Sequence, residues 1–145
     1  MTELSGRLEG RVHVYPVRVY FENTDAAGIV YHSNYLNFAE RARTEMMRLM
    51  DFAHARMWEG GRAFAVRHCV VDFRRSAVLD DLLEIRSRLV GVGGATVEID
   101  QSFERPADGL HIARLYLRLA SITRDGRPAR LPAELRDKIR TFISD

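Results

Sequence analysis

The sequence of 145 residues has little cysteine, little lysine and no long apolar run. Its one cysteine, Cys69, excludes an internal disulfide; it stands in a strand-like run and is expected to be a buried, inert thiol. No apolar run approaches the ~18 residues of a membrane span. The charged N-terminal stretch also lacks the apolar centre of a secretory signal. These features together lead us to expect a protein of the reducing cytoplasm.

The basic residues are almost all arginine, because Lys138 is the one lysine among 22 lysines and arginines. GC-rich coding is the simplest explanation, although arginine also suits phosphate recognition. The net charge is only +2 and no basic run is interleaved with aromatic residues, so nucleic acid is not an expected partner. The sequence also lacks a Walker loop, a dinucleotide fingerprint, a Gly-x-Ser-x-Gly elbow and Cys/His pairs at metal-ligand spacing. We therefore expect no cofactor and no metal.

Hydrophobic periodicity predicts one domain at residues 11–145, preceded by a flexible tail at 1–10. The expected elements are a strand at 12–22, a helix at 34–51, a short helical segment near 53–58, strands at 63–73, 82–90, 96–104 and 110–122, and a terminal helix from Pro132. The long helix carries an apolar stripe of Tyr35, Phe38, Ala39, Ala42, Met46 and Leu49. One long helix packed on antiparallel strands predicts an α+β fold.

Residues 17–35, VRVYFENTDAAGIVYHSNY, combine a strand pattern, a turn and the start of the helix. Alternation in the first part predicts a strand whose buried face includes Phe21. Turn-forming residues follow, and Ser33 is the expected N-cap of the helix. Asp25 is therefore expected in a tight loop beside the free backbone N–H groups of a helix N-terminus.

Asp25 and His32 are the candidate catalytic residues. Taken alone, a loop aspartate is more often a turn or cap residue, and a lone histidine is more often structural. Gly28 lies between them and could let the backbone approach a ligand closely. The N–H groups near His32 could polarise a carbonyl oxygen, as an oxyanion hole does, while Asp25 attacks that carbonyl or activates water.

A thioester is the substrate that suits this pair. Its leaving group is a thiol with a pKa of ~8.5, which departs without a strong general acid. An amide would need protonation of its amine, and His32 is the one obvious proton donor nearby.

The same stretch carries a recognisable motif: Asp25, Gly28, the triplet Val30-Tyr31-His32, and Tyr35. With this motif the chain resembles the hotdog-fold acyl-CoA thioesterases of the 4-hydroxybenzoyl-CoA thioesterase type, and most of all their Tol–Pal-associated (YbgC-type) branch. The similarity continues through ERARTE, AFAVRHCVVDF and LDDLLEIRSRL, and it covers nearly the whole chain.

The resemblance implies a hotdog fold, in which a five-stranded antiparallel sheet wraps the long helix. It implies that two chains pair edge to edge and commonly assemble further into tetramers. The site would lie at the subunit interface near the N-terminus of the helix, and no metal would be required. The implied substrate is an acyl-CoA, hydrolysed to a free acid and coenzyme A.

The resemblance also implies roles for individual residues. Asp25 matches the catalytic carboxylate. His32 matches the position whose backbone N–H polarises the thioester carbonyl, with its side chain assisting. The motif positions Gly28, Val30, Tyr31 and Tyr35 are candidate substrate-binding residues. Phe64 and Val66 would come from the neighbouring chain and line the acyl pocket.

The sequence departs from the family pattern at a few positions. Phe21 stands where tyrosine is frequent, Ala27 where glycine is common, and Val78 and Gly93 where relatives carry basic residues. Arg74 and Arg75 are candidate contacts for the coenzyme A phosphates in place of those basic residues. The alternative for this arginine pair is an ordinary solvated turn.

Two other functions stay open at this stage. One is an enoyl-CoA hydratase, which would need an aspartate and a histidine acting on water across a double bond; in hydratase relatives the pair is closer in sequence than Asp25 and His32 are. The other is a catalytically weak module that binds acyl carrier protein or enzymes of lipid synthesis. Assays of thiol release and enoyl-CoA hydration, with a search for tight protein partners, would separate the three.

Overall fold

The computed structural model describes residues 3–52 and 54–143. Its strands are β1 (Arg7–Glu9), β2 (Val12–Arg18), β3 (Arg62–Phe73), β4 (Leu82–Val92), β5 (Thr96–Arg105) and β6 (Leu110–Thr123). Its α-helices are α1 (His32–Leu49), α2 (His54–Glu59) and α3 (Ala133–Phe142), and η1 (Glu3–Ser5) and η2 (Phe21–Asn23) are short 3-10 helices. Ala53, within the expected short helical segment, lies outside the described residues.

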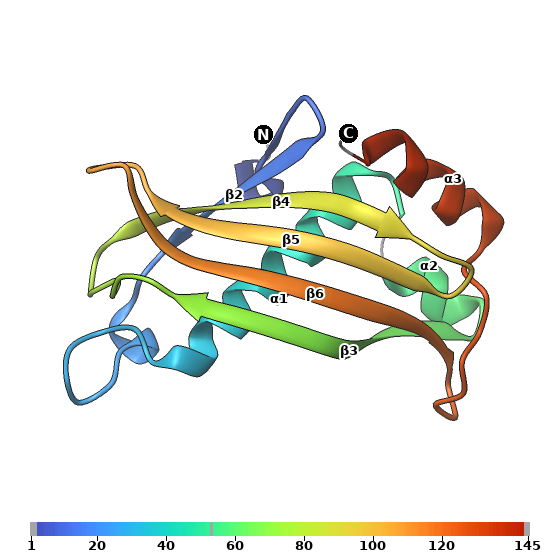
Figure 1. Cartoon of the computed structure of the whole chain (residues 1–145), viewed down its shortest axis with the longest axis horizontal. Coiled ribbons are helices and arrows are strands. Elements are labelled where there is room, and N and C mark those ends of the chain that lie inside the picture. The colour runs from blue at the N-terminus through green and yellow to red at the C-terminus, as the bar shows by residue number, and fades with distance from the viewer. Residues whose placement is uncertain (1–2, 53, 144–145) are drawn as a thin grey trace.

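The six strands form one antiparallel sheet in the order β1-β2-β4-β5-β6-β3. The long helix α1 runs along the back of this sheet, as Figure 1 shows. This arrangement confirms the predicted α+β layout of one long helix on an antiparallel sheet. The expected number of strands was five; the sixth, β1, comes from the segment expected to be a flexible tail, where Arg7 pairs with Val14 of β2.

The region between β2 and α1 differs from the sequence prediction. β2 ends at Arg18, because the N–H and C=O of Val19 bond to the 80–81 turn instead of continuing the strand. Phe21 consequently lies in η2 with 82% of its surface exposed, and its expected place on a buried strand face was wrong. The helix begins at His32 with Tyr31 as N-cap, so the expected N-cap at Ser33 was also wrong.

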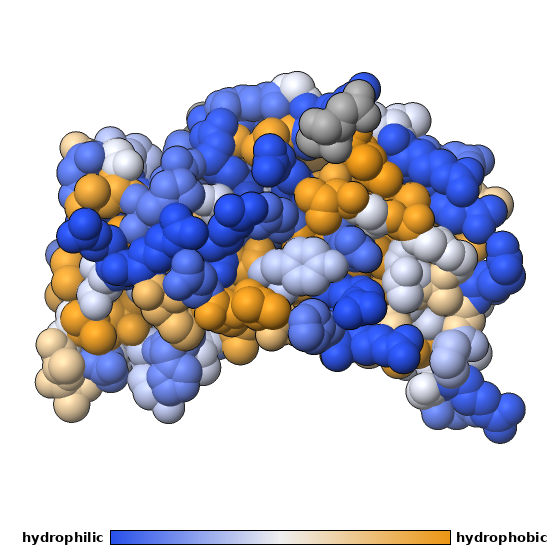
Figure 2. Space-filling view, viewed as in Figure 1, coloured by the Kyte–Doolittle hydropathy of each residue, from blue (hydrophilic) through white to orange (hydrophobic). Residues whose placement is uncertain are grey.

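Alternation along the strands separates a buried inner face from a charged outer face. The inner side chains of β5 and β6 are buried against α1, among them Ile99, Phe103, Leu115 and Leu117. Outward side chains pair across strands, as Arg114 does with Asp100. Figure 2 shows this outer face, on which hydrophilic residues surround smaller hydrophobic patches. The period of two predicted from the sequence therefore holds along these strands.

Two positions on α1 break the predicted apolar stripe. Leu49 is 39% exposed, although it belongs to the expected stripe. Arg43 is buried, and one of its guanidinium N–H groups donates to Oε1 of Gln101 on β5 at 3.0 Å. Among the described residues, no helix is long and apolar enough to cross a membrane.

Candidate active site

Asn23 holds together the loop that leads from β2 to α1. Its buried side-chain oxygen accepts the N–H of Tyr20 at 2.8 Å. Its backbone oxygen accepts the N–H of Tyr31 at 2.9 Å and the side-chain amide of Asn34 at 2.8 Å. One residue therefore links the end of the strand region to the start of the helix.

Asp25 lies at the start of a tight turn within this loop. The N–H of Asp25 donates to the carbonyl of Ile29 at 2.9 Å, and the N–H of Gly28 donates to the carbonyl of Asp25 at 3.0 Å. Oδ1 of Asp25 accepts the N–H of Ala27 at 2.8 Å, while Oδ2 bonds to no other described residue. The carboxylate is thus held by one oxygen and presents the other.

Gly28 adopts a φ of +81°, in the left-handed region that disfavours residues with a Cβ. An added Cβ would meet no atom within 4 Å, so space is not what requires glycine here. The turn itself requires it, because closing 25–29 needs this backbone conformation. Gly28 therefore contributes to the site by shaping the turn that carries Asp25.

The N-terminus of α1 forms the second part of the site. His32 is its first residue, and the N-cap residue Tyr31 supplies no side-chain hydrogen bond to the first turn. The first N–H groups of a helix lack partners within the helix and carry partial positive charge. The imidazole of His32 lies beside the ring of Tyr31, with their centroids 4.5 Å apart and their planes tilted by 48°. The helix start can therefore polarise an oxygen that lies next to it.

These two parts meet in a cleft of about 330 Å³. The cleft is lined by Asp25, Ile29, Val30, His32, Tyr35, Phe73, Arg74, Arg75 and Ser76. The structure thus brings together both candidate catalytic residues, two candidate substrate-binding residues and both candidate phosphate contacts. Gly28 and Tyr31 do not line it; they form its turn and its helix cap.

Tyr35 closes the inner side of the cleft. It is buried, and its hydroxyl oxygen accepts the N–H of Ala77 at 3.3 Å. Burial raises the pKa of this phenol, so the ring is neutral near pH 7. Phe73 meets Tyr35 edge to face, with their ring centroids 5.5 Å apart. This aromatic pair makes the inner wall of the cleft apolar beside the carboxylate.

Arg74 and Arg75, the two arginines of the cleft, differ in the polar contacts of their side chains. The backbone N–H groups of Arg74 and Arg75 both donate to the carbonyl of Ile112, at 2.9 and 3.0 Å, which fixes the turn after β3. The guanidinium of Arg74 pairs with Asp72 at 2.9 Å. The guanidinium of Arg75 has no polar partner among the described residues. Arg75 is therefore the more available of the two for an anionic group.

Phe64 and Val66 lie elsewhere, in a second cavity of about 420 Å³. This cavity is lined by Glu40, Arg43, Thr44, Met46, Met47, Met50, Phe64, Val66, Leu89, Val97, Ile99, Leu119, Leu135 and Ile139. Within one chain it shares no residue with the cleft of Asp25. A single copy therefore does not join the expected acyl-pocket residues to the catalytic pair.

The sequence prediction missed several residues of the site. Asn23 read as one more turn residue, and its burial comes from bonds to both ends of the loop. Phe73 lies at the end of the inward-facing row of β3, where register with Ala113 sets its direction. Its position at the strand end, directly before two arginines, is the signal that could have placed it in the site.

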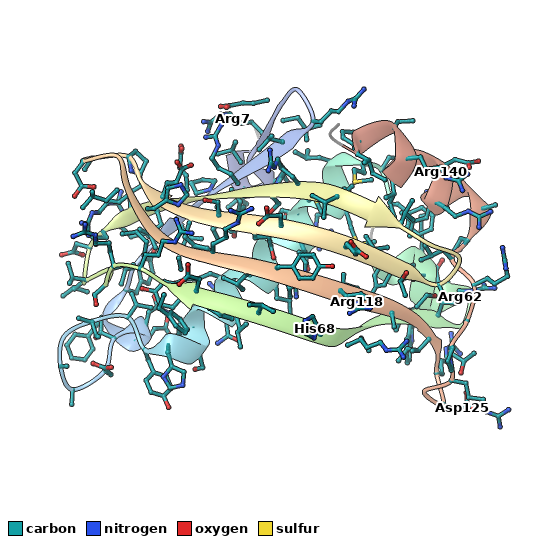
Figure 3. All side chains as sticks on the ribbon, in the orientation of Figure 1. Arg7, Arg62, His68, Arg118, Asp125 and Arg140 are labelled. Carbon is teal, nitrogen blue, oxygen red and sulfur yellow. The ribbon has the colours of Figure 1, made fainter. Side chains whose placement is uncertain are left out.

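A metal site finds no support among the described residues, because no group of three or more His, Cys, Asp and Glu side chains lies close together. Cys69 and His68 face opposite sides of β3: Cys69 packs against the core, while His68 lies opposite Arg118. Figure 3 shows His68 and Arg118 side by side on neighbouring strands of the outer face. The thiol of Cys69 is half-buried, less than the sequence led us to expect.

An antiparallel sheet on one long helix, with a carboxylate beside the start of that helix, matches a known class of enzymes. The model of the thioesterase-like superfamily matches residues 19–139, so the chain belongs to this superfamily. The family predicted from the sequence is confirmed, and the fold is the hotdog fold.

Similar proteins carry names in the same family. The chain is 37% identical over 124 residues to the acyl-CoA thioesterase YbgC of Haemophilus influenzae, covering 84% of this chain and 90% of that protein. It is 44% identical over 87 residues to the acyl-CoA thioester hydrolase YbgC of Escherichia coli O6:H1, covering 60% and 65%. The crystal structure of a probable thioesterase from Bartonella henselae is similar with a TM-score of 0.79 and 34% identity, covering 83% of this chain and 99% of that one.

Proposed function

We propose that this protein is an acyl-CoA thioesterase that hydrolyses acyl-CoA to a free acid and coenzyme A. The observation that carries the proposal is that Asp25 and the start of α1 at His32 line one cleft. The relatives named as acyl-CoA thioesterases support the choice of substrate class.

The chemistry follows from the two parts of the cleft. The thioester carbonyl oxygen binds at the N–H groups of the first turn of α1, which stabilise the charge that develops during attack. Oδ2 of Asp25, the oxygen not bonded to Ala27, either attacks the carbonyl carbon or takes a proton from the attacking water. The C–S bond then breaks, and coenzyme A leaves as the thiolate of a thiol with a pKa of ~8.5. When Asp25 is the base, the acid forms directly from the water; when Asp25 is the nucleophile, water hydrolyses the resulting anhydride to the free acid and restores the carboxylate. His32 and Tyr35 border the reacting group, and Arg75 lies free for a phosphate.

The proposal includes a pair of chains joined through β3. This strand ends the sheet, and Val66, Val70 and Phe73 on it are each about half exposed. An exposed edge strand of 12 residues offers a row of backbone groups for pairing with a second copy. Antiparallel pairing about a two-fold axis would place the Phe73 end of one β3 beside the Phe64 end of the other.

Pairing of this kind would join the two cavities that one chain keeps apart. The cleft of one copy would open toward the cavity of the other, so that Phe64 and Val66 of the second copy complete the acyl pocket. A tetramer built from two such pairs and a cytoplasmic location belong to the same proposal. Acyl carrier protein is the other candidate carrier of the acyl group.

The decisive experiment measures free-thiol release from a panel of short-chain, long-chain and aromatic acyl-CoAs. Asp25→Asn should lower kcat by roughly 10²- to 10⁴-fold, the usual contribution of a positioned acid–base group. Asp137→Asn, at an exposed position of α3, is the matched control and should keep full activity. A folded Asp25→Asn variant with wild-type turnover would overturn the proposal. Enoyl-CoA hydration without thiol release would favour a hydratase, and tight binding of acyl carrier protein without turnover would favour a scaffold.

A further inference from the structure

The cavity between α1, the sheet and α3 contains a charged group that the proposed hydrolysis does not use. Its walls are mostly apolar, formed by methionines of α1, Phe64 and branched residues of the strands, and Leu135 and Ile139 of α3; Glu40 and Thr44 of α1 also line it. Its volume of about 420 Å³ falls within the roughly 300–1,000 Å³ of small-molecule sites. Arg43 of α1 lines this apolar space with only 8% of its surface exposed.

The guanidinium of Arg43 makes few polar contacts for the side chain of a buried residue. It donates one hydrogen bond, to Oε1 of Gln101, out of five N–H donors. Among residues 3–52 and 54–143, no carboxylate forms an ion pair with it. Glu40 acts on it through space, but Glu40 is exposed and its charge is screened by water. Its Nε and Nη2, which make no hydrogen bond, are not among the fully buried nitrogens, so they reach the solvent of the cavity and can bind an anionic group there.

Structural support alone does not account for an arginine here. The side-chain amide of Gln101 already ties α1 to the sheet, because it donates to the carbonyl of Ala39 at 3.0 Å and to Oγ of Ser87 at 2.9 Å. Arg43 adds one more hydrogen bond to this cluster, and its remaining guanidinium N–H groups have no acceptor among the described residues. Burial lowers the pKa of Arg43 from the ordinary value, and the charge of Glu40 offsets this only in part.

We propose that Arg43 is a specificity-determining residue, which selects straight-chain acyl groups that carry a second carboxylate at their far end. This inference rests on the proposed function and on the pairing through β3, which brings the cavity of one copy to the cleft of the other. The methylene chain lies among the methionines, whose flexible side chains adapt to it. The terminal carboxylate pairs with the guanidinium in a two-pronged, charge-assisted contact.

The test compares each dicarboxylyl-CoA with the plain acyl-CoA of the same length. The pairs are succinyl with butanoyl, adipoyl with hexanoyl, suberoyl with octanoyl, and sebacoyl with decanoyl. The wild-type protein should show a ratio of kcat/KM, dicarboxylyl over plain, that peaks at one length, where the carboxylate reaches Arg43. Arg43→Met should lower that peak by roughly 10- to 100-fold, the value of hydrogen bonds to a charged group.

Two further variants keep the test decisive. Arg43→Gln preserves an amide donor for Gln101 while removing the charge, and it should lose the peak as Arg43→Met does even if the latter folds poorly. Arg41→Met, an exposed arginine two residues away on the same helix, should keep the peak. A peak that persists in folded Arg43→Gln, or a wild-type protein without any peak, overturns the inference.

A failure of the proposed hydrolysis can be distinguished from a failure of the inference on Arg43. If no acyl-CoA releases thiol, hydrolysis is excluded, and calorimetric titration of Asp25→Asn with suberoyl-CoA and octanoyl-CoA decides the role of Arg43 by itself. Tighter binding of the dicarboxylyl ester that is lost in Asp25→Asn/Arg43→Gln supports the inference. Equal or absent binding of the two esters overturns it.

Discussion

The cleft and the cavity lie at opposite ends of the same helix and the same strand. Asp25 and His32 meet Phe73 where α1 begins and β3 ends, whereas Met46 and Met50 meet Phe64 where α1 ends and β3 begins. The cleft is built from a loop, a helix start and charged side chains. The cavity is built mostly from packed apolar side chains, with Glu40, Arg43 and Thr44 as its polar members. The difference shows how one helix–strand pair can provide reactive groups at one end and a binding volume at the other.

Turn geometry should affect the cleft far more than the cavity. Gly28 and Gly126 both adopt a positive φ, +81° and +88°, and an added Cβ would meet nothing within 4 Å at either site. Alanine at either position should therefore cost a similar ~1–2 kcal/mol of unfolding free energy, from backbone strain alone. Only Gly28→Ala should lower kcat, by about 10²-fold, because it displaces Asp25.

Denaturant unfolding and acyl-CoA kinetics on the two variants check this comparison. Equal losses of stability with an effect on kcat at Gly28 alone would show that the turn serves the cleft. Similar kinetics for the two variants would show that the activity of Asp25 does not depend on the conformation of its turn.

Pairing through β3 is the link between the two regions. Val70 lies on the outer face of this edge strand and is 51% exposed. Val70→Lys would place two like charges near the two-fold axis and should shift the protein toward monomers. Hydrolysis of long acyl-CoAs should fall about 10-fold or more, in step with the monomer fraction. Leu82→Lys, at a similarly exposed residue of β4, is the control.

Sedimentation velocity alongside kinetics measures both quantities. A Val70→Lys monomer that keeps wild-type activity on long chains would mean that each cleft works with a pocket of its own chain.

The cleft could be predicted from the sequence more fully than the cavity, for physical reasons. Asp25, His32 and Tyr35 lie close together in the chain, so local turn and helix geometry nearly suffices to bring them together. The cavity depends on residues from α1, four strands and α3, whose meeting is decided by packing across the sheet. Local patterns carry no information on such long-range contacts.

Three individual residues show the same limit within the fold. The alternating pattern predicts a strand that runs on to Phe21, but backbone bonds of Val19 to the 80–81 turn end β2 first. Arg43 is charged, so local pattern gives no reason to expect its burial, and its hydrogen bond to Gln101 on a distant strand helps to hold it inside. The strand and helix periods were predictable because they follow from local backbone geometry.

Mild acid should test the fold separately from the cleft and the cavity. His13 is fully buried on β2, where its Nε2 bonds to the carbonyl of Ser5 at 2.7 Å and Glu45 lies near enough to act on it. Burial, the largest cause, lowers the pKa of His13 below its ordinary value of 6.5. As the pH falls, the unfolded chain therefore binds the proton before the folded chain does. The free energy of unfolding decreases as the pH falls through about 6.5 toward the lower pKa of the folded state.

Unfolding free energies measured between about pH 5 and 8 check this dependence. His13→Gln should flatten the acid slope while leaving the acyl-CoA preference unchanged, because His13 lines neither the cleft nor the cavity. An unchanged slope would assign the acid sensitivity to other groups.

The smallest expected effect separates the two arginines at the rim of the cleft. Arg75 has no polar partner among the described residues, whereas Arg74 is already paired with Asp72. Exposed charge pairs contribute about 0.2–1 kcal/mol, so Arg75→Ala should raise KM for acyl-CoA by up to about 5-fold. Arg74→Ala should change it less, and added salt should remove the difference, because salt screens exposed charges. Steady-state kinetics at low and high ionic strength measure both; equal effects, or effects insensitive to salt, would place the coenzyme A phosphates away from this rim.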